Sequence, residues 1–252
     1  MSSVGFDTPD AAPGIRLSGA RLHYEGVALF DNLSLNLPAG RTSCLLGPSG
    51  VGKSSLLALL AGLNAAAEGK IEASDGAALQ GRVAWMAQQD LLLPWLNVQD
   101  NVTLGDRLRR QPPKHARRLH LLEQVGLAER ADSVPAALSG GMRQRVALAR
   151  TLYENQPVIF MDEPFAALDA VTRLELQDLA GGLLAGRTVL LVTHDPLEAL
   201  RLGHHLLVLT GRPARISEAF APPGMPPRAP DDPSLLALQA RLLAALRRKE
   251  GA

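Results

Sequence analysis

The segment at residues 47–54 constrains this chain more than any other. It runs Gly-Pro-Ser-Gly-Val-Gly-Lys-Ser and fits the pattern G-x-x-x-x-G-K-[ST] of phosphate-binding loops. The apolar residues 42–46 before it predict a buried strand, and the leucine-rich residues 55–61 after it predict a helix that ends at Gly62. Strand, glycine loop and helix form the context that such a loop needs. The pattern therefore favours nucleotide binding in an α/β protein over a plain glycine-rich turn.

The residue types in this loop explain the preference. Glycines have no Cβ, so the backbone can curl with its N–H groups pointing inward. Lys53 can reach the β- and γ-phosphates, and the Ser54 hydroxyl can serve Mg²⁺. We expect the phosphates of a nucleotide to contact the loop and the residue after it: Gly47, Pro48, Ser49, Gly50, Val51, Gly52, Lys53, Ser54 and Ser55.

Composition narrows the partners. The 252 residues are enough for one large α/β domain, with or without a small appendage. Lys and Arg total 26 against 25 for Asp and Glu, so net charge gives no reason to expect nucleic acid. The single Cys44 excludes an internal disulfide and is expected to be a buried thiol. Residues 1–14 lack the apolar core of a secretory signal, and no apolar window predicts a membrane span, so we expect any membrane role to come through a partner.

The order of the predicted elements favours a parallel sheet covered on both faces. Alternating polarity in residues 15–46 predicts antiparallel strands, and residues 68–90 contain two further strand candidates. Beyond them, helical patterns alternate with buried strands. The helical patterns cover residues 97–133 (interrupted by Pro112 and Pro113), 139–154, 170–184 and 195–201, and the strands cover 158–161 and 188–193.

Residues 138–144, Leu-Ser-Gly-Gly-Met-Arg-Gln, predict a second anion site. Ser139 is a good N-cap, and Gly140 and Gly141 leave the next N–H groups bare at a helix start. One phosphate loop already serves its own nucleotide. The motif closely resembles the signature motif of ATP-binding cassette (ABC) proteins. That resemblance implies that the motif of one subunit completes the ATP site of the other.

Residues 158–163, Val-Ile-Phe-Met-Asp-Glu, resemble the Walker B strand of the same family. Adjacent strand residues point to opposite sides, so Asp162 and Glu163 should have different tasks. The resemblance assigns Asp162 to Mg²⁺, directly or through water, and Glu163 to the attacking water as general base. The alternative, a surface pair of acids that caps a helix, does not explain the position after the buried strand.

Three further motifs match the family pattern. Residues 166–169 match the D-loop, which the resemblance places at the dimer interface. His194, after a buried strand, matches the H-loop, whose histidine can donate to the γ-phosphate. Tyr24 fits the A-loop, whose aromatic ring stacks on adenine; the alternative is an ordinary strand aromatic.

Gln88 fits the family's Q-loop, whose amide senses Mg²⁺ and the water; the spacing to Trp95 favours it over Gln89. Residues 91–102 resemble the Leu-Leu-Pro-Trp segment of importers for nitrate, sulfonate, taurine and thiamine precursors, and residues 211–216 also resemble that group. The run at residues 86–95 looks most similar to the members for pyrimidine thiamine precursors. We expect Leu93, Pro94 and Trp95 to dock on a membrane subunit, with a buried core segment as the alternative.

The resemblance covers about residues 15–217 and implies a fold and a function. The fold is an α/β P-loop NTPase of ABC type, with a parallel core sheet, an antiparallel β subdomain and a helical subdomain. The function is ATP hydrolysis in an importer, with ATP and Mg²⁺ as cofactors. The partners are a second copy of the chain, a membrane permease and, through the permease, a periplasmic or extracellular solute-binding protein. The chain would then lie at the cytoplasmic face of the membrane; a soluble or exporter-type ABC ATPase is the alternative.

The expected domain boundaries follow from these motifs. We expect an unstructured N-terminus at residues 1–14, an ATP-binding domain at 15–220 and a helical subdomain at about 91–155. A Pro-rich linker and a terminal helix would fill residues 221–252. Six leucines predict one apolar face on that helix: Leu235, Leu236, Leu238, Leu242, Leu243 and Leu246. We expect the face to pack on its own domain, with a regulatory or docking role as the alternative; the transported solute touches no residue of this chain.

Overall fold

The computed structural model describes residues 11–24, 26–63, 68–166 and 168–247. Most of the predicted unstructured N-terminus, residues 1–10, lies outside this range. Its last two residues are bonded to the fold: the Thr188 hydroxyl donates to the Pro13 carbonyl at 2.7 Å, and the Gly14 N–H donates to Ser74 Oγ at 2.9 Å. The prediction that residue 14 is unstructured is therefore wrong.

An antiparallel sheet opens the chain, as predicted. It joins β1 (Ile15–Tyr24), β2 (Val27–Leu37) and β4 (Glu68–Ala73) in the order β2-β1-β4. Buried and exposed residues alternate through much of β1 and the second half of β2. The sheet thus faces the interior with one side only, which is typical of antiparallel sheets.

The larger sheet is the core of the molecule. Its strand order is β5-β6-β7-β3-β8-β9, parallel from β5 to β8, with β9 antiparallel at the edge. Its strands are β3 (Thr42–Leu46), β5 (Val83–Met86), β6 (Val158–Asp162), β7 (Thr188–Val192), β8 (His205–Thr210) and β9 (Arg215–Phe220). Every residue of β6 and β7 is buried, because elements cover both faces of the sheet. Cys44 in β3 is fully buried, as predicted.

The register of the parallel strands brings their carboxyl ends to one edge. Leu45 of β3 and Asp162 of β6 both pair with Val192 of β7. The segments that follow these three strands therefore begin side by side. They are the phosphate loop, the pair Asp162–Glu163 and the turn that contains His194.

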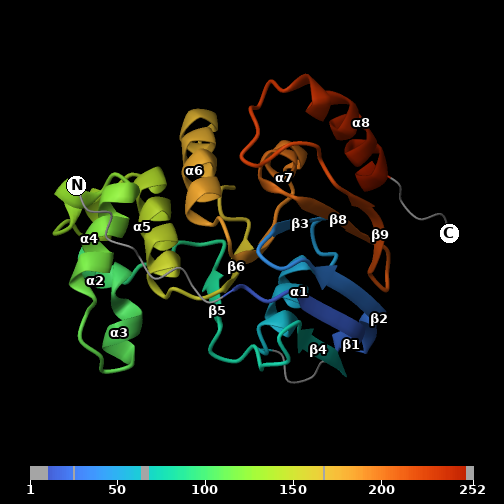
Figure 1. The fold of residues 1–252 in the computed structure, drawn as a ribbon, viewed down its shortest axis with the longest axis horizontal. Helices are drawn as coiled ribbons and strands as arrows, with labels where there is room; N and C mark the ends of the chain where they lie inside the picture. The colour runs from blue at the N-terminus through green and yellow to red at the C-terminus, as the bar shows by residue number, and fades with distance from the viewer. Residues whose placement is uncertain (1–10, 25, 64–67, 167, 248–252) are drawn as a thin grey trace.

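The helices form two groups (Figure 1). α1 (Lys53–Leu60) packs on β6 and β7, and α7 (Pro196–Leu202) packs on β3. α6 (Ala170–Leu183) contacts α5 and α7. The second group lies between β5 and β6 in the chain and forms the green helical layer of Figure 1. It consists of α2 (Val98–Val102), α3 (Leu104–Leu108), α4 (His115–Gln124), the short 3₁₀ helices η1 (Ala128–Arg130) and η2 (Pro135–Ala137), and α5 (Gly140–Tyr153).

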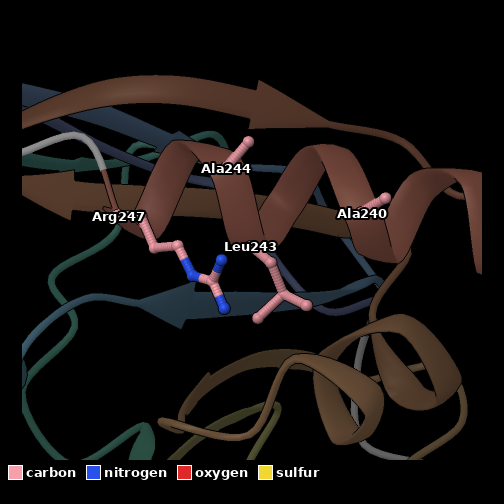
Figure 2. Close-up of a pocket in the computed structure, with 4 residues that line it drawn as sticks. All are labelled: Ala240, Leu243, Ala244 and Arg247. Atoms are coloured by element: carbon pink, nitrogen blue, oxygen red, sulfur yellow. The ribbon is translucent and has the colours of Figure 1, made fainter.

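The terminal helix α8 (Pro233–Arg247) packs on α7 and β8 through Leu235, Leu242 and Ala245. Leu236 is 63% exposed and Leu243 is 36% exposed, so the prediction of a single apolar face is wrong for these two residues. Each follows a buried leucine by one position, which turns its side chain about 100° around the helix axis. Figure 2 shows a pocket on this helix that is lined by Leu243, Ala240, Ala244 and Arg247.

The segment predicted as a linker is fixed to the fold by Arg228. Its buried guanidinium donates to one carbonyl oxygen in the proline-rich segment and to one in α7. The distances are 2.6 Å to Pro223 and 2.7 Å to Leu200. Further bonds reach Gly203, Pro222 and Gly224. Burial lowers the pKa of this guanidinium. None of the helices in the part of the chain that the structure describes combines the length and apolar character needed to cross a membrane.

Candidate functional site

The phosphate loop connects β3 to α1 and leaves no room for a larger residue at its first position. A Cβ on Gly47 would clash with the Leu209 carbonyl oxygen. Lys53 is buried, and its Nζ donates to the carbonyls of Gly47 at 2.8 Å and Pro48 at 3.1 Å. Burial lowers the pKa of Lys53, while Glu163 and Asp162 raise it. The loop thus holds the ammonium group over its own backbone, where a phosphate would meet it.

Asp162, at the end of β6, and Ser54, in the first turn of α1, form an oxygen pair. Burial raises the pKa of Asp162, and a hydrogen bond from the Ser54 side chain lowers it. Carboxylate and hydroxyl oxygens are ligands that Mg²⁺ prefers, and Mg²⁺ usually takes few protein ligands together with phosphate and water oxygens. No cluster of three His, Cys, Asp or Glu side chains suited to a metal occurs among the described residues. The pair therefore fits Mg²⁺ held jointly with a nucleotide, and does not form an all-protein metal cage.

Three predicted site residues meet at one carboxylate oxygen, Oε2 of Glu163. Gln88 Nε2, beyond β5, lies 3.3 Å from it, and His194 Nδ1, beyond β7, lies 3.1 Å from it. The Glu163 N–H donates to the Val192 carbonyl at 2.9 Å. Glu163 has a φ of 45°, a left-handed conformation that is unusual for a residue other than glycine and is often found at functional sites. This turn at the strand end gathers residues from three strands around one acid.

Tyr24 lies at the end of β1 and is 70% exposed. The antiparallel sheet that carries it also packs against the phosphate loop, because a Cβ on Gly52 would lie 3.0 Å from Phe30 Cε1. The sheet that contacts the loop therefore also carries an exposed aromatic ring. Stacking on adenine stays a prediction.

Ser139 occupies the N-cap of α5, as predicted, and accepts a hydrogen bond from the Met142 N–H at 3.2 Å. Ser139 and Gly140 are exposed, and a Cβ on Gly141 would lie 2.6 Å from Thr172 Cγ2, so a larger residue would disturb the contact with α6. α5 packs on α2, α4, β5 and α6, whereas α1 packs on β6 and β7. No hydrogen bond between Ser139 and the phosphate loop occurs within the described ranges.

The D-loop residue Asp169 caps α6, with Oδ1 accepting from the Thr172 N–H at 3.0 Å. This bond and the Thr172 side chain lower the pKa of Asp169. Ala167 of the same motif lies outside the described residues. The cap accounts for the local role of Asp169, and its place at a dimer interface stays a prediction.

The sequence patterns do not predict a buried polar network around α7, the helix that follows His194. Arg201 in α7 donates to Asp178 at 2.6 Å, to the Arg228 carbonyl at 3.0 Å and to Gln177. Burial raises the pKa of Glu198 to about 8, and hydrogen bonds with Thr193 and Gln177 lower it. The run Asp-Pro-Leu-Glu at residues 195–198 has the spacing of a capping box, which could have pointed to Glu198.

Comparison with known proteins agrees with this geometry. The sequence profile of the family described as "ABC transporter" matches residues 30–166. An aliphatic sulfonates import ATP-binding protein of Rhodococcus jostii (strain RHA1) is 43% identical over 95% of this chain and 96% of its own length. The corresponding protein of Delftia acidovorans is 42% identical over 96% and 97%. An uncharacterized ABC transporter ATP-binding protein of Haemophilus influenzae (strain Rd) is 42% identical over 92% and 98%.

A solved structure gives the same result for the fold. It is the dimeric, post-hydrolysis state of the ATP-binding cassette MJ0796 bound to ADP and Pi. It covers 84% of this chain and 100% of its own, with 27% identity and a TM-score of 0.71. The predicted fold class, an α/β P-loop NTPase of ABC type, is confirmed.

Proposed function

The chain belongs to the ABC transporter family of ATP-binding proteins, and from this premise we propose that it hydrolyses ATP to drive solute import through a membrane permease. The observation that carries the proposal is the convergence of Gln88 and His194 on Glu163, beside the phosphate loop. A simple nucleotide-binding protein has no need of a base held in this way. Because the signature motif at Ser139 is exposed, it could contact the nucleotide of a second copy of the chain.

The chemistry of ATP hydrolysis gives each of these residues a task. Glu163 accepts a proton from the water whose oxygen attacks the γ-phosphorus, while the bond from that phosphorus to the β-phosphate oxygen breaks. His194 and Gln88 orient the base and the water, and Lys53 offsets charge on the phosphates. Asp162, Ser54 and Gln88 would hold Mg²⁺, which supplies electrostatic stabilisation of the phosphate oxygens when it is bound.

The second copy completes the site. Ser139, Gly140 and Gly141 present an N-cap hydroxyl and bare N–H groups at the positive end of α5, a suitable anion site. Because Ser139 and Gly140 are exposed, we assign them to the nucleotide of the partner chain. The dimeric state of the similar ATP-binding cassette with ADP and Pi supports this arrangement.

The permease would contact the segment at residues 91–96, called the docking segment below, which contains the predicted docking residues Pro94, Trp95 and the half-buried Leu93. Trp95 is 73% exposed and Leu91 is 58% exposed, next to the exposed Pro94. An exposed aromatic and proline at one site suits a cytoplasmic helix of a membrane subunit. The chain would then sit at the cytoplasmic face of the membrane, and the solute-binding protein would act through the permease.

We propose aliphatic sulfonates as the solute class. Two relatives with this name are 42–43% identical over almost the whole chain, which favours sulfonates over nitrate, taurine and thiamine precursors. The test is growth of a strain that lacks this chain, with an alkanesulfonate as the sole sulfur source. We expect the strain to need the parental chain, and the Glu163→Gln variant should not restore growth. Normal growth without the chain would exclude sulfonate uptake as its function.

A further inference from the structure

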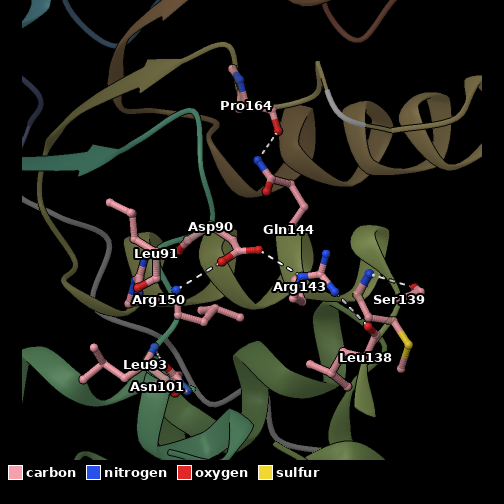
Figure 3. A network of polar contacts seen from close by, with 12 residues as sticks. Asp90, Leu91, Leu93, Asn101, Leu138, Ser139, Arg143, Gln144, Arg150 and Pro164 are labelled. Atoms are coloured by element: carbon pink, nitrogen blue, oxygen red, sulfur yellow. Dashed lines mark hydrogen bonds and ion pairs between the residues drawn. The ribbon is translucent and has the colours of Figure 1, made fainter. Parts of the chain in front are cut away.

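Helix α5 carries the signature serine at its start and touches two other parts of the site through polar side chains. Gln144 donates to the carbonyl of Pro164, the residue after Glu163. Arg143 and Arg150 reach Asp90, two residues after Gln88. Figure 3 shows these contacts as one network along the helix. The helix that begins at Ser139 therefore contacts both the residue after Glu163 and the residue before the docking segment.

Arg143 makes the central contact. Its Nη1 donates to the Leu138 carbonyl at 3.0 Å, and its Nε forms an ion pair with Asp90 Oδ2 at 3.0 Å. Leu138 directly precedes Ser139, whose carbonyl accepts from the Arg143 N–H at 3.0 Å. Because a guanidinium is planar and its donors have fixed directions, it holds its two acceptors in a fixed relation. The peptide that leads into Ser139 is thus joined to the segment after Gln88.

The docking segment is also held from its near end. Arg150 donates to the carbonyls of Asp90 at 2.6 Å and Leu91 at 2.9 Å. Leu91 has a φ of 46°, so the chain turns sharply at this point. Two guanidinium groups, two helical turns apart on α5, therefore fix the start of the segment.

The far end of the segment is held by Asn101 of α2, which is fully buried. Its Nδ2 donates to the Leu96 carbonyl at 3.0 Å, and its Oδ1 accepts from the Leu93 N–H at 2.8 Å. Trp95 lies between these two anchor points with 73% of its surface exposed. A displacement of Trp95 would therefore also move the groups in α2 and α5 that are hydrogen-bonded to its segment.

We propose that Arg143 is a positioning residue whose ion pair with Asp90 couples the exposed Trp95 surface to Ser139. Nucleotide binding against Ser139 and contact at Trp95 then alter each other's affinity, because coupling between two sites is reciprocal. The inference rests on the proposed function, in which Ser139 serves the partner's ATP. The side chains of Arg143 and Asp90 are 40% and 30% exposed, so their pair contributes little to folding, and coupling can be separated from stability.

The test uses the full chain with Trp85→Phe and Glu163→Gln as background. Trp95 is then the sole tryptophan of the chain, which has two, and ATP with Mg²⁺ is retained in the dimer. Size-exclusion chromatography reports the dimer, and acrylamide quenching reports the exposure of Trp95. Asp90→Asn removes one charge of the pair but keeps Leu138 bonded to Arg143. Arg145→Gln is the matched control, because Arg145 on the same helix pairs at 2.9 Å with Glu175 in α6.

In the background chain, we expect ATP to change the quenching of Trp95. Asp90→Asn should still form the dimer but lose this change. Arg143→Gln should lose the change and need about 5- to 150-fold more ATP for half-maximal dimer formation, the usual range of coupling factors. Arg145→Gln should keep both. An ATP-dependent change that survives Asp90→Asn, a dimer without any Trp95 response, or equal losses in all three variants would overturn the coupling. Absence of the dimer in the background chain would instead refute the proposed function.

Discussion

The phosphate-loop region and the signature region serve, by our proposal, the same kind of ligand, yet they are built differently. In the first, Lys53 and Asp162 are buried, and both are hydrogen-bonded within their own chain. In the second, Ser139 and Gly140 are exposed, and the Ser139 hydroxyl accepts only from its own helix among the contacts within the described residues. One chain can organise the buried, hydrogen-bonded phosphate-loop region by itself. The exposed signature region can enclose a ligand only when another surface approaches it.

The largest effect on turnover should come from a substitution at Glu163, the proposed general base. Glu163→Gln keeps the size of the side chain but removes the base, so turnover should fall about 10²- to 10⁴-fold. ATP binding should remain, and the chain should elute as a dimer with ATP. The measurements are phosphate release and size-exclusion chromatography. Glu175→Gln, an exposed acid in α6, is the control. Turnover at the parental rate would remove Glu163 from the site.

Lys53 comes next, because it acts on binding. Lys53→Ala removes a buried charged donor, and hydrogen bonds to charged groups contribute about 1.5–3 kcal/mol. ATP affinity should therefore fall about 10- to 150-fold in titration calorimetry. Lys70→Ala is the control, since Lys70 is exposed in β4 and pairs with Glu72. If both variants bind equally well, the buried half is not where the phosphates lie.

A substitution at Trp95 tests the role of an exposed surface residue. A Trp anchor at an interface typically contributes about 2–4 kcal/mol, so Trp95→Ala should abolish or strongly weaken co-purification with the permease. The melting temperature should barely change, because the side chain is 73% exposed. Leu108→Ala, an exposed residue in α3, should retain the permease. A sharp fall in melting temperature with the complex intact would identify Trp95 as a packing residue.

The smallest effect concerns Glu198, behind the buried half. Its pKa is raised from 4.5 to about 8 by burial, so between these values the folded chain holds a proton that the unfolded chain releases. Stability should therefore fall as pH rises through this window. Glu198→Gln should remove that fall and melt about 2–4 °C above the parent at high pH, the shift that roughly 1 kcal/mol gives at this size. Parallel melting curves of the two proteins from about pH 5 to 9 would contradict the assignment.

Sequence reasoning found what local patterns encode. The phosphate loop, the Asp162–Glu163 pair and the Ser139 cap depend on a few adjacent residues, and the structure places each at the expected end of a strand or helix. Their convergence could be anticipated only because parallel strands end at one edge. The roles assigned to these residues stay predictions until they are measured.

The remaining features depend on contacts between distant segments. Asp90 and Arg143 are 53 positions apart, and nothing in either neighbourhood shows that they meet. Arg228 lies in a proline-rich stretch that is typical of a linker. It is nevertheless buried, and it donates hydrogen bonds to carbonyl groups of α7 and of its own loop. The sequence pattern predicts Leu236 and Leu243 on the buried face, because it does not distinguish adjacent leucines; both are exposed. Tertiary packing decides all three cases.

The central claim is that the exposed signature motif of one chain completes the buried site of another. The most direct test mixes two variants in the Glu163→Gln background, Ser139→Arg in one chain and Lys53→Ala in the other. In such a heterodimer one composite site keeps both parental halves, and the second site contains both lesions. We expect a stable heterodimer that retains one ATP, whereas neither variant alone should form a dimer. If the mixture forms no ATP-bound heterodimer, Ser139 acts within its own chain or not at all, and the shared site does not exist.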